Sequence, residues 1–334
     1  MGRTTIRDVA DEANVSISTV SLYIRGQAGV GEETGQRIAA AIKKLDYMPR
    51  PRSSTENGHT FVGLLIERSA LSSFSDIFYG DMIHSLEAKA KEVGWGVLLS
   101  IIENDGQIPQ IVTENQARGL FILGGSPTND ALAVKLVQQN IPLVLVDNYI
   151  WGLETNCVVP DNRWGGYVAL KHLVDLGHTR IAIIEGPRKY KTLTDRLEGA
   201  LRAAEDCGLT ISPEYLQVSL SHGHPKKGYL EMKHLLSLPE PPTAVFTISD
   251  KTAVGALEAI KEAGLKVPED ISIVGFDDVA KTEPALTTVC VPRYELGVLA
   301  MQQLIEVMNG EAEIPVRTSV YTYLVIRDST AQLK

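Results

Sequence analysis

Residues 8–26 read DVADEANVSISTVSLYIRG, and two short helical patterns meet within them. Apolar residues at the spacing i, i+3, i+4 and i+7, counted from Ile6, indicate an amphipathic first helix. Asn14 suits the end of that helix because asparagine tolerates left-handed dihedral angles. Ser16 is a good N-cap for a second helix over about 17–24. Two helices joined by so short a turn predict a helix-turn-helix, whose second helix can lie in the major groove of DNA.

The second helix separates an apolar side from a mixed side. Val20 and Ile24 lie four residues apart and can bury against the first helix. The opposite side carries Ile17, Ser18, Ser21 and Leu22. Leaving two aliphatic side chains in water costs about 25 cal/mol per Å² of apolar area. The two either pack on a neighbouring segment or meet base edges in the groove, where a thymine methyl is the natural apolar partner.

A third helix is predicted over about 32–45, with Gly31 at its N-cap. Ile38 and Ile42 share one face of it and complete a three-helix core. We expect this head to span residues 1–48.

Length and charge describe the rest of the chain. A chain of 334 residues exceeds one ordinary domain. Residues 1–52 hold eight Lys/Arg and six Asp/Glu, whereas the remainder holds 24 and 35, so a mildly basic head precedes an acidic body. The apolar runs are too short to span a bilayer, the start is no secretory signal, and three scattered cysteines suit reduced thiols. We expect a cytoplasmic protein without membrane partners.

The head resembles a known family of regulators. TIRDVADEANVSISTVSLYIRG, followed by VGEET, QRIAAA and LDYMP, is similar to the DNA-binding head of the LacI/GalR-type repressors. The resemblance implies base contacts by Ile17, Ser18 and Leu22. It implies phosphate contacts by Thr5, Ser16, Thr19, Ser21 and Tyr47. Many relatives carry arginine at the Leu22 position, which discriminates guanine by about 1–3 kcal/mol. Because leucine cannot do so, we expect an A·T pair or shape readout there.

Residues 49–60, PRPRSSTENGHT, form the expected linker. Relatives carry a short hinge helix here, with an Ala-rich turn and a leucine wedge, and this segment has neither. Pro49 and Pro51 disfavour helix at the residues before them. Arg50 and Arg52 suit a narrow minor groove, and the alternative is a flexible spacer with incidental charge.

From Phe61 onward, apolar strands alternate with helical patterns. The predicted strands span 61–67, 96–102, 119–124, 142–147, 180–186, 244–249 and 271–277. The predicted helices lie near 79–93, 129–139, 163–176, 191–207, 225–237, 250–263 and 294–309. Continuous apolar strands between helices imply parallel sheets covered on both faces. We therefore expect an α/β body of two doubly wound lobes.

The same family resemblance extends through the body. It rests on GYVALKHLVDLGHTRIAIIEGP, VPEDISIVGFDD and RDST. It implies a dimerising effector sensor over 61–334 that resembles periplasmic sugar-binding proteins. Lobe one would comprise 61–160 and 293–321, and lobe two 162–290 and 322–334.

Ligands of doubly wound sheets bind beyond the carboxyl ends of the strands. The resemblance assigns effector contacts to Asp147, Arg196, Ser249 and Asp277. Carboxylates with a guanidinium suit a polyol, because each hydroxyl both donates and accepts. Aromatic faces complete such sites, and the candidates are Phe74, Phe78, Tyr79, Trp151 and Trp164, with Phe78 and Trp151 as the predicted contacts. Asp250 and Asp278 are expected to cap the helix or turn that follows each of them.

Motifs for other chemistry are missing from the sequence. No G-x-G-x-x-G, Walker A or G-x-S-x-G occurs, and His222 and His224 lie in a polar loop without nearby cysteine. We expect no cofactor, no metal and no catalysis. The sequence thus predicts a homodimeric repressor that a small carbohydrate releases from a near-palindromic operator. The alternatives are an effector that acts as a co-repressor (purine-like or another small molecule), a ligand-binding protein with a non-functional head, and an enzyme using Asp147 or Asp277 as a base.

Overall fold

The computed structural model describes residues 6–24, 30–45, 47, 60–67, 77–103, 107–218, 225–312 and 314–334. Contacts divide the chain into two compact units, Met1–Arg52 and Ser53–Lys334. Six residues singled out above, and the linker before residue 60, lie outside the described residues: Thr5, Arg50, Arg52, Phe74, His222 and His224.

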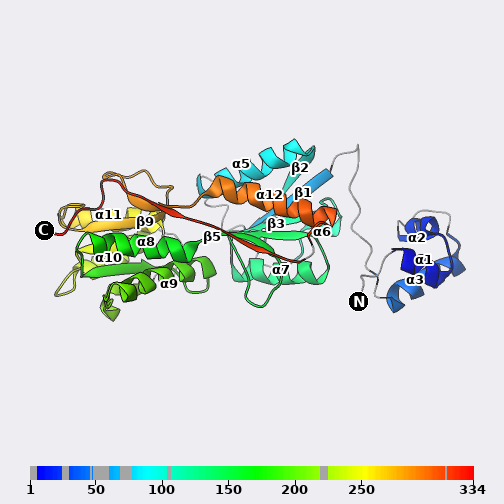
Figure 1. Cartoon of the computed structure of the whole chain (residues 1–334), viewed down its shortest axis with the longest axis horizontal. Coiled ribbons are helices and arrows are strands. Elements are labelled where there is room, and N and C mark those ends of the chain that lie inside the picture. The colour runs from blue at the N-terminus through cyan, green and yellow to red at the C-terminus, as the bar shows by residue number, and fades with distance from the viewer. Residues whose placement is uncertain are drawn as a thin grey trace. The chain divides into compact units, whose positions relative to one another are not determined.

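The first unit is a three-helix head made of α1 (Ile6–Ala13), α2 (Ile17–Ile24) and α3 (Glu32–Lys44) (Figure 1). Asn14 has a φ of 51°, so the chain turns in the left-handed region as soon as α1 ends. Ser16 Oγ accepts a hydrogen bond from the Thr19 backbone N–H at 3.1 Å and caps α2. The predicted helix-turn-helix is confirmed.

The head has a small apolar core. Its buried members are Val9, Ala10, Ala13, Val20, Ile38 and Ala41. Ile24 and Ile42 pack on the edge of this core and are partly buried. Tyr23 packs there too, against Gly35, where an added Cβ would come within 3.0 Å of the tyrosine ring. A glycine on α3 therefore makes room for an aromatic side chain that the sequence did not place on the core face.

Lobe one of the second unit is a parallel sheet in the order β11-β5-β4-β3-β1-β2. Its strands are β1 (Thr60–Glu67), β2 (Trp95–Ile102), β3 (Leu120–Leu123), β4 (Leu143–Val146), β5 (Asn156–Pro160) and β11 (Arg317–Val320). The helices α5 (Ile77–Glu92) and α12 (Arg293–Asn309) cover one face. The single turn α6 (Gln110–Thr113) and α7 (Pro127–Gln138) cover the other.

Lobe two repeats this plan in the order β12-β10-β9-β8-β6-β7, with only β12 antiparallel to its neighbour among the described strands. Its strands are β6 (Ile181–Glu185), β7 (Leu216–Val218), β8 (Ala244–Thr247), β9 (Ser272–Asp277), β10 (Thr287–Cys290) and β12 (Tyr323–Val325). The helices α8 (Asn162–Asp175) and α9 (Lys191–Asp206) cover one face. The 3-10 turn η1 (Pro213–Tyr215), α10 (Pro225–Leu236) and α11 (Asp250–Glu262) cover the other.

The predicted α/β class with two doubly wound lobes is confirmed. The chain passes between the lobes after β5, after β10 and after β11 (Figure 1). Five strands had not been predicted: β5, β7, β10, β11 and β12. All five are short, and four of them begin or end on polar residues or proline, so their apolar signal is weak.

Two glycines bring α8 and α9 into direct backbone contact. A Cβ added to Gly166 would collide with the Arg196 carbonyl, and a Cβ added to Gly199 would collide with the Arg163 carbonyl. Each helix thus needs a glycine opposite the other helix's backbone. This close approach sets the position of α9, which carries Arg196.

Gly199→Ala should therefore destabilise the protein by about 2 kcal/mol or more, since overpacking a tight contact costs about 1–3 kcal/mol. Gly80 on α5 is the matched control, because no atom lies within 4 Å of a Cβ added there. Gly80→Ala should stabilise by about 0.5–1 kcal/mol, as alanine is the better helix former. Urea unfolding measures both changes, and equal effects of the two substitutions would contradict the close contact.

Candidate functional site

The reading side of α2 faces outward from the head core. Ile17 is 41% exposed, Ser18 is exposed and Leu22 is half-buried. Neither aliphatic side chain belongs to the apolar cluster of the head. Both side chains thus lie outside the head core, and packing of the two on a neighbouring segment stays a prediction. Contact with base edges stays a prediction.

Four of the predicted phosphate-contacting residues are described by the structure: Ser16, Thr19, Ser21 and Tyr47. Ser16 Oγ lies 2.8 Å from Thr19 Oγ1, so these two hydroxyls are hydrogen-bonded to each other at the start of α2. Tyr47 packs partly buried on the head core, and its backbone N–H donates to the Ile42 carbonyl at 3.0 Å. Ser21 is half-buried on α2. Thr5, Arg50 and Arg52 lie outside the described residues, so their phosphate and minor-groove contacts stay predictions.

In the body, Arg196 on α9 is the most firmly held of the predicted effector residues. Its guanidinium donates to Asn162 Oδ1 at 2.9 Å and to the Ile248 carbonyl at 2.8 Å. It forms an ion pair with Asp277 Oδ1 at 2.8 Å and lies 3.8 Å from the centre of the Phe276 ring. Only 4% of Arg196 is exposed. The guanidinium is therefore fixed at the carboxyl ends of β8 and β9.

Asp147 follows β4 and reaches the same region from lobe one. It has a φ of 57° and is 6% exposed, and its Oδ1 has no hydrogen-bond partner in the part of the chain that the structure describes. Burial raises the pKa of Asp147 to about 7, with Arg196 opposing that rise and Asp277 adding to it. Burial also raises the pKa of Asp277, against the lowering effect of Arg196. A buried acceptor without a partner is costly unless a ligand supplies one.

Tyr79 on α5 shares this electrostatic environment. Burial raises its pKa, and the charges of Asp147 and Asp277 raise it further, so the hydroxyl stays protonated and can donate. The hydroxyl lies against Gly124, where an added Cβ would come within 2.6 Å of it. Phe78 packs edge-on against Tyr79 at 5.1 Å between ring centres. The structure thus brings Asp147, Arg196 and Asp277 together with an aromatic wall, and Tyr79 was not among the predicted contacts.

Ser249 and Trp151 have other neighbours. Ser249 is buried and its Oγ accepts from the Thr252 backbone N–H at 3.4 Å, so this oxygen caps α11. Trp151 is 69% exposed and stacks edge-on with Tyr149, 6.0 Å between ring centres. Effector contacts by these two residues stay predictions, and Ser249 already has a structural use.

The expectation that Asp250 caps its own helix was wrong. Its carboxylate accepts from the Val279 and Ala280 backbone N–H groups at 2.7 and 3.1 Å, and from Thr288 Oγ1 at 2.5 Å. Burial raises the pKa of Asp250 to about 6. The carboxylate anchors the loop after Asp277 instead, because Ser249 fills the N-cap position.

Asp278 forms an ion pair with Arg327 at 2.6 Å. Asp250 and Asp278 thus each already have structural partners within lobe two.

Other functional classes find little support among the described residues. No group of three or more His, Cys, Asp or Glu there could hold a metal ion. No described helix has the length and apolar character of a membrane span. The residues around Arg196 offer hydrogen-bonding groups and ring faces, which suits binding.

A helix-turn-helix head joined to a two-lobed body with a buried polar site defines a ligand-responsive DNA-binding regulator. Residues 5–50 match the bacterial regulatory proteins of the lacI family, and residues 170–330 match the periplasmic binding protein-like domain. The chain is 34% identical to the HTH-type transcriptional repressor CytR of Escherichia coli strain K12 over 338 residues, covering 98% of this chain and 97% of that protein. The chain belongs to the lacI family.

Two further relatives support this assignment. The HTH-type transcriptional repressor PurR of Histophilus somni strain 129Pt is 33% identical over 341 residues, covering 98% of this chain and 99% of PurR. The solved complex of the transcriptional regulator CelR with cellobiose has a TM-score of 0.75 and 28% identity, covering 98% of this chain and all of that one. The relatives are transcriptional regulators.

The raised pKa of Asp147 predicts how stability depends on pH. An unfolded aspartate titrates near pH 4, so between about pH 4 and 7 the folded protein keeps a proton that the unfolded chain has lost. The free energy of unfolding should fall as pH rises through this window, by up to about 1.4 kcal/mol per pH unit. Asp147→Asn removes this contribution.

Urea unfolding of wild type and Asp147→Asn at several pH values between about 4.5 and 6.5 checks this. We expect the stability difference, wild type minus variant, to decrease steadily with pH. Contributions from titrating groups that do not interact with Asp147, such as Asp250, cancel in that difference. A difference that does not change with pH would show that the Asp147 carboxyl is ionised across the whole range.

Proposed function

We propose that the protein is a homodimeric transcriptional repressor that binds a near-palindromic operator and responds to a small polyhydroxylated effector. The observation that carries the DNA-binding half is the outward side of α2, where Ile17 and Ser18 are exposed and Leu22 lies outside the head core. A recognition helix presents such a side to the major groove. Its site of action would be the bacterial cytoplasm, where operator DNA is.

The effector half rests on the buried cluster of Asp147, Arg196 and Asp277. The cluster offers one fixed guanidinium and two carboxyls, and one carboxyl oxygen lacks a partner among the described residues. Because the pKa of Asp147 is about 7, this group can donate or accept near neutral pH. Neighbouring hydroxyls on a sugar or on a ribose match such a set, since each both donates and accepts. The cellobiose complex of CelR supports a carbohydrate.

Dimerisation would bring two heads to one operator. The edge strand β2 of lobe one presents Leu99 and Ile101 to solvent, 49% and 37% exposed. An edge strand offers unpaired backbone groups, and exposed apolar side chains on it can pack against a second chain. A two-fold dimer pairs with two half-sites of opposite orientation.

The effector either releases the operator or promotes binding to it. Release is the proposal. Co-repression is the second candidate. An effector that binds the closed lobes shifts the protein toward whichever arrangement of the two heads those lobes favour, and that arrangement can be the one that fits the operator. The sign of the change in operator affinity on adding effector separates the two.

Operator selection from random DNA with wild type and Leu22→Arg tests the DNA-binding half. We expect the wild-type sequences to be near-palindromic, with an A·T pair or a shape signature facing Leu22. Leu22→Arg should move one position in each half-site to G·C, with discrimination of about 1–3 kcal/mol. Ala40→Arg on an exposed part of α3 is the matched control for added charge. The same selected sequences from all three proteins would contradict base contact by Leu22.

A further inference from the structure

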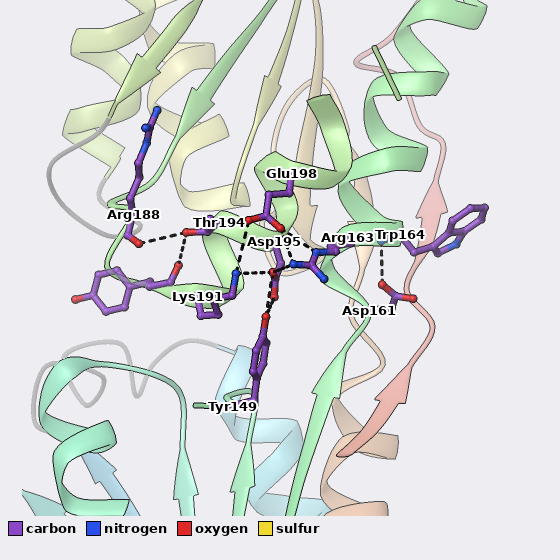
Figure 2. A network of polar contacts seen from close by, with 10 residues as sticks. Tyr149, Asp161, Arg163, Trp164, Arg188, Lys191, Thr194, Asp195 and Glu198 are labelled. Atoms are coloured by element: carbon purple, nitrogen blue, oxygen red, sulfur yellow. Dashed lines mark hydrogen bonds and ion pairs between the residues drawn. The ribbon is translucent and has the colours of Figure 1, made fainter. Parts of the chain in front are cut away.

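Tyr149 makes a direct hydrogen-bonded contact between the two lobes. It lies in the loop after β4 of lobe one, and only 6% of it is exposed. Its hydroxyl reaches both carboxylate oxygens of Asp195 on α9 of lobe two, at 2.8 and 3.1 Å (Figure 2). Asp195 is 5% exposed. The contact therefore lies within the protein, where a broken hydrogen bond is not simply replaced by water.

Two cations flank the Asp195 carboxylate in this buried position. Lys191 Nζ and Arg163 Nη2 lie 3.1 and 3.2 Å from Asp195 Oδ1, on either side of the carboxylate (Figure 2). Glu198 pairs with the same two cations, at 2.6 Å from Arg163 and 3.7 Å from Lys191. The two negative charges of Asp195 and Glu198 are thus matched by the two positive charges of Arg163 and Lys191. Tyr149 donates to a carboxylate, and a hydrogen bond to a charged group is stronger than a neutral one.

The ring of Tyr149 is held as well. The Arg317 guanidinium from β11 lies 3.9 Å from the ring centre on the lobe-one side. Lys191 of lobe two lies 5.9 Å from the same ring and 5.8 Å from the Trp151 ring. Burial and the Asp195 charge raise the pKa of Tyr149, so its hydroxyl keeps the proton that it donates. Arg317 thus holds the ring from lobe one, and Asp195 and Lys191 contact Tyr149 from lobe two.

Each partner of this contact is a near neighbour of an effector-site residue in the sequence. Tyr149 comes two residues after Asp147, and Asp195 immediately precedes Arg196. Successive side chains of a helix point about 100° apart. Asp195 thus faces Tyr149 while Arg196 faces Asp277. Separating Tyr149 from Asp195 would also separate Asp147 from Arg196.

We propose that Tyr149 and Asp195 are positioning residues, whose hydrogen bond holds the lobes at the closed distance where Asp147 and Arg196 face one site. Neither residue needs to touch the effector. The consequence of this hydrogen bond for the effector response rests on the proposed function, whereas its effect on the distance between the lobes does not. Where an effector binds only the closed form, its apparent affinity scales with the closed fraction.

The cysteines of the chain allow a direct measurement of lobe distance. Cys207 lies exposed after α9 in lobe two, whereas Cys157 and Cys290 are buried. Gln138→Cys adds a second exposed site at the end of α7 in lobe one. Spin labels on residues 138 and 207 report the separation by pulsed dipolar spectroscopy on the full chain, diluted with unlabelled protein so that only distances within one chain contribute.

Tyr149→Phe should lower the ratio of closed to open protein by about 10-fold or more, which is the effect of losing a hydrogen bond to a charged group. Asp195→Ala, which removes the acceptor, should do the same, and the double variant should lose no more than the larger single loss. Tyr215→Phe is the matched control, because the Tyr215 hydroxyl donates to the Glu240 carbonyl at 2.7 Å within lobe two. It should leave the separation unchanged.

A Tyr149→Phe distance distribution equal to those of wild type and Tyr215→Phe would overturn the proposal. So would a double variant in which the two losses simply add. The measurement needs neither operator nor effector. Its failure would leave the proposed function standing, and failure of the proposed function would leave the distances unaffected.

Discussion

The proposed effector site depends on the fixed guanidinium of Arg196. Hydrogen bonds to Asn162 and to the Ile248 carbonyl hold it from two sides, and the ion pair with Asp277 holds it from a third. Its backbone is set in turn by the close approach of α8 and α9. A charge this buried is tolerable only with such partners. The arrangement therefore fixes a positive group at one place in lobe two.

Lobe one contributes Asp147, whose buried Oδ1 has no hydrogen-bond partner among the described residues. Three ionisable groups, two acidic and one basic, thus meet in a region of low polarizability, and the raised pKa of Asp147 is the electrostatic result. A ligand with several hydroxyls removes that cost by satisfying both lobes at once. In the proposed function, closing the lobes and binding the effector are one event, which the DNA-binding head would couple to the operator.

The sequence was sufficient for features with strong local patterns. The helix-turn-helix, the cap at Ser16 and the alternation of apolar strands with helices were all predicted, because each depends on residues near one another in the chain. Short strands such as β5 were missed, since proline and asparagine weaken their apolar signal. The Tyr149–Asp195 contact joins residues 46 apart across two lobes, and no periodicity reports such a pairing. Asp250 was misjudged because its neighbour Ser249 caps the helix instead.

The measurement that tests the account most directly is operator affinity in the presence of candidate effectors, compared between wild type and Asp147→Asn. Fluorescence anisotropy with a selected operator and a panel of mono- and disaccharides and nucleosides, ribose and cellobiose included, would provide it. At least one compound should weaken operator binding by wild type about 5- to 150-fold. The variant should bind operator normally and lose that response. An equal response from both proteins, or none from wild type, would contradict a polyol site built on Asp147 and Arg196.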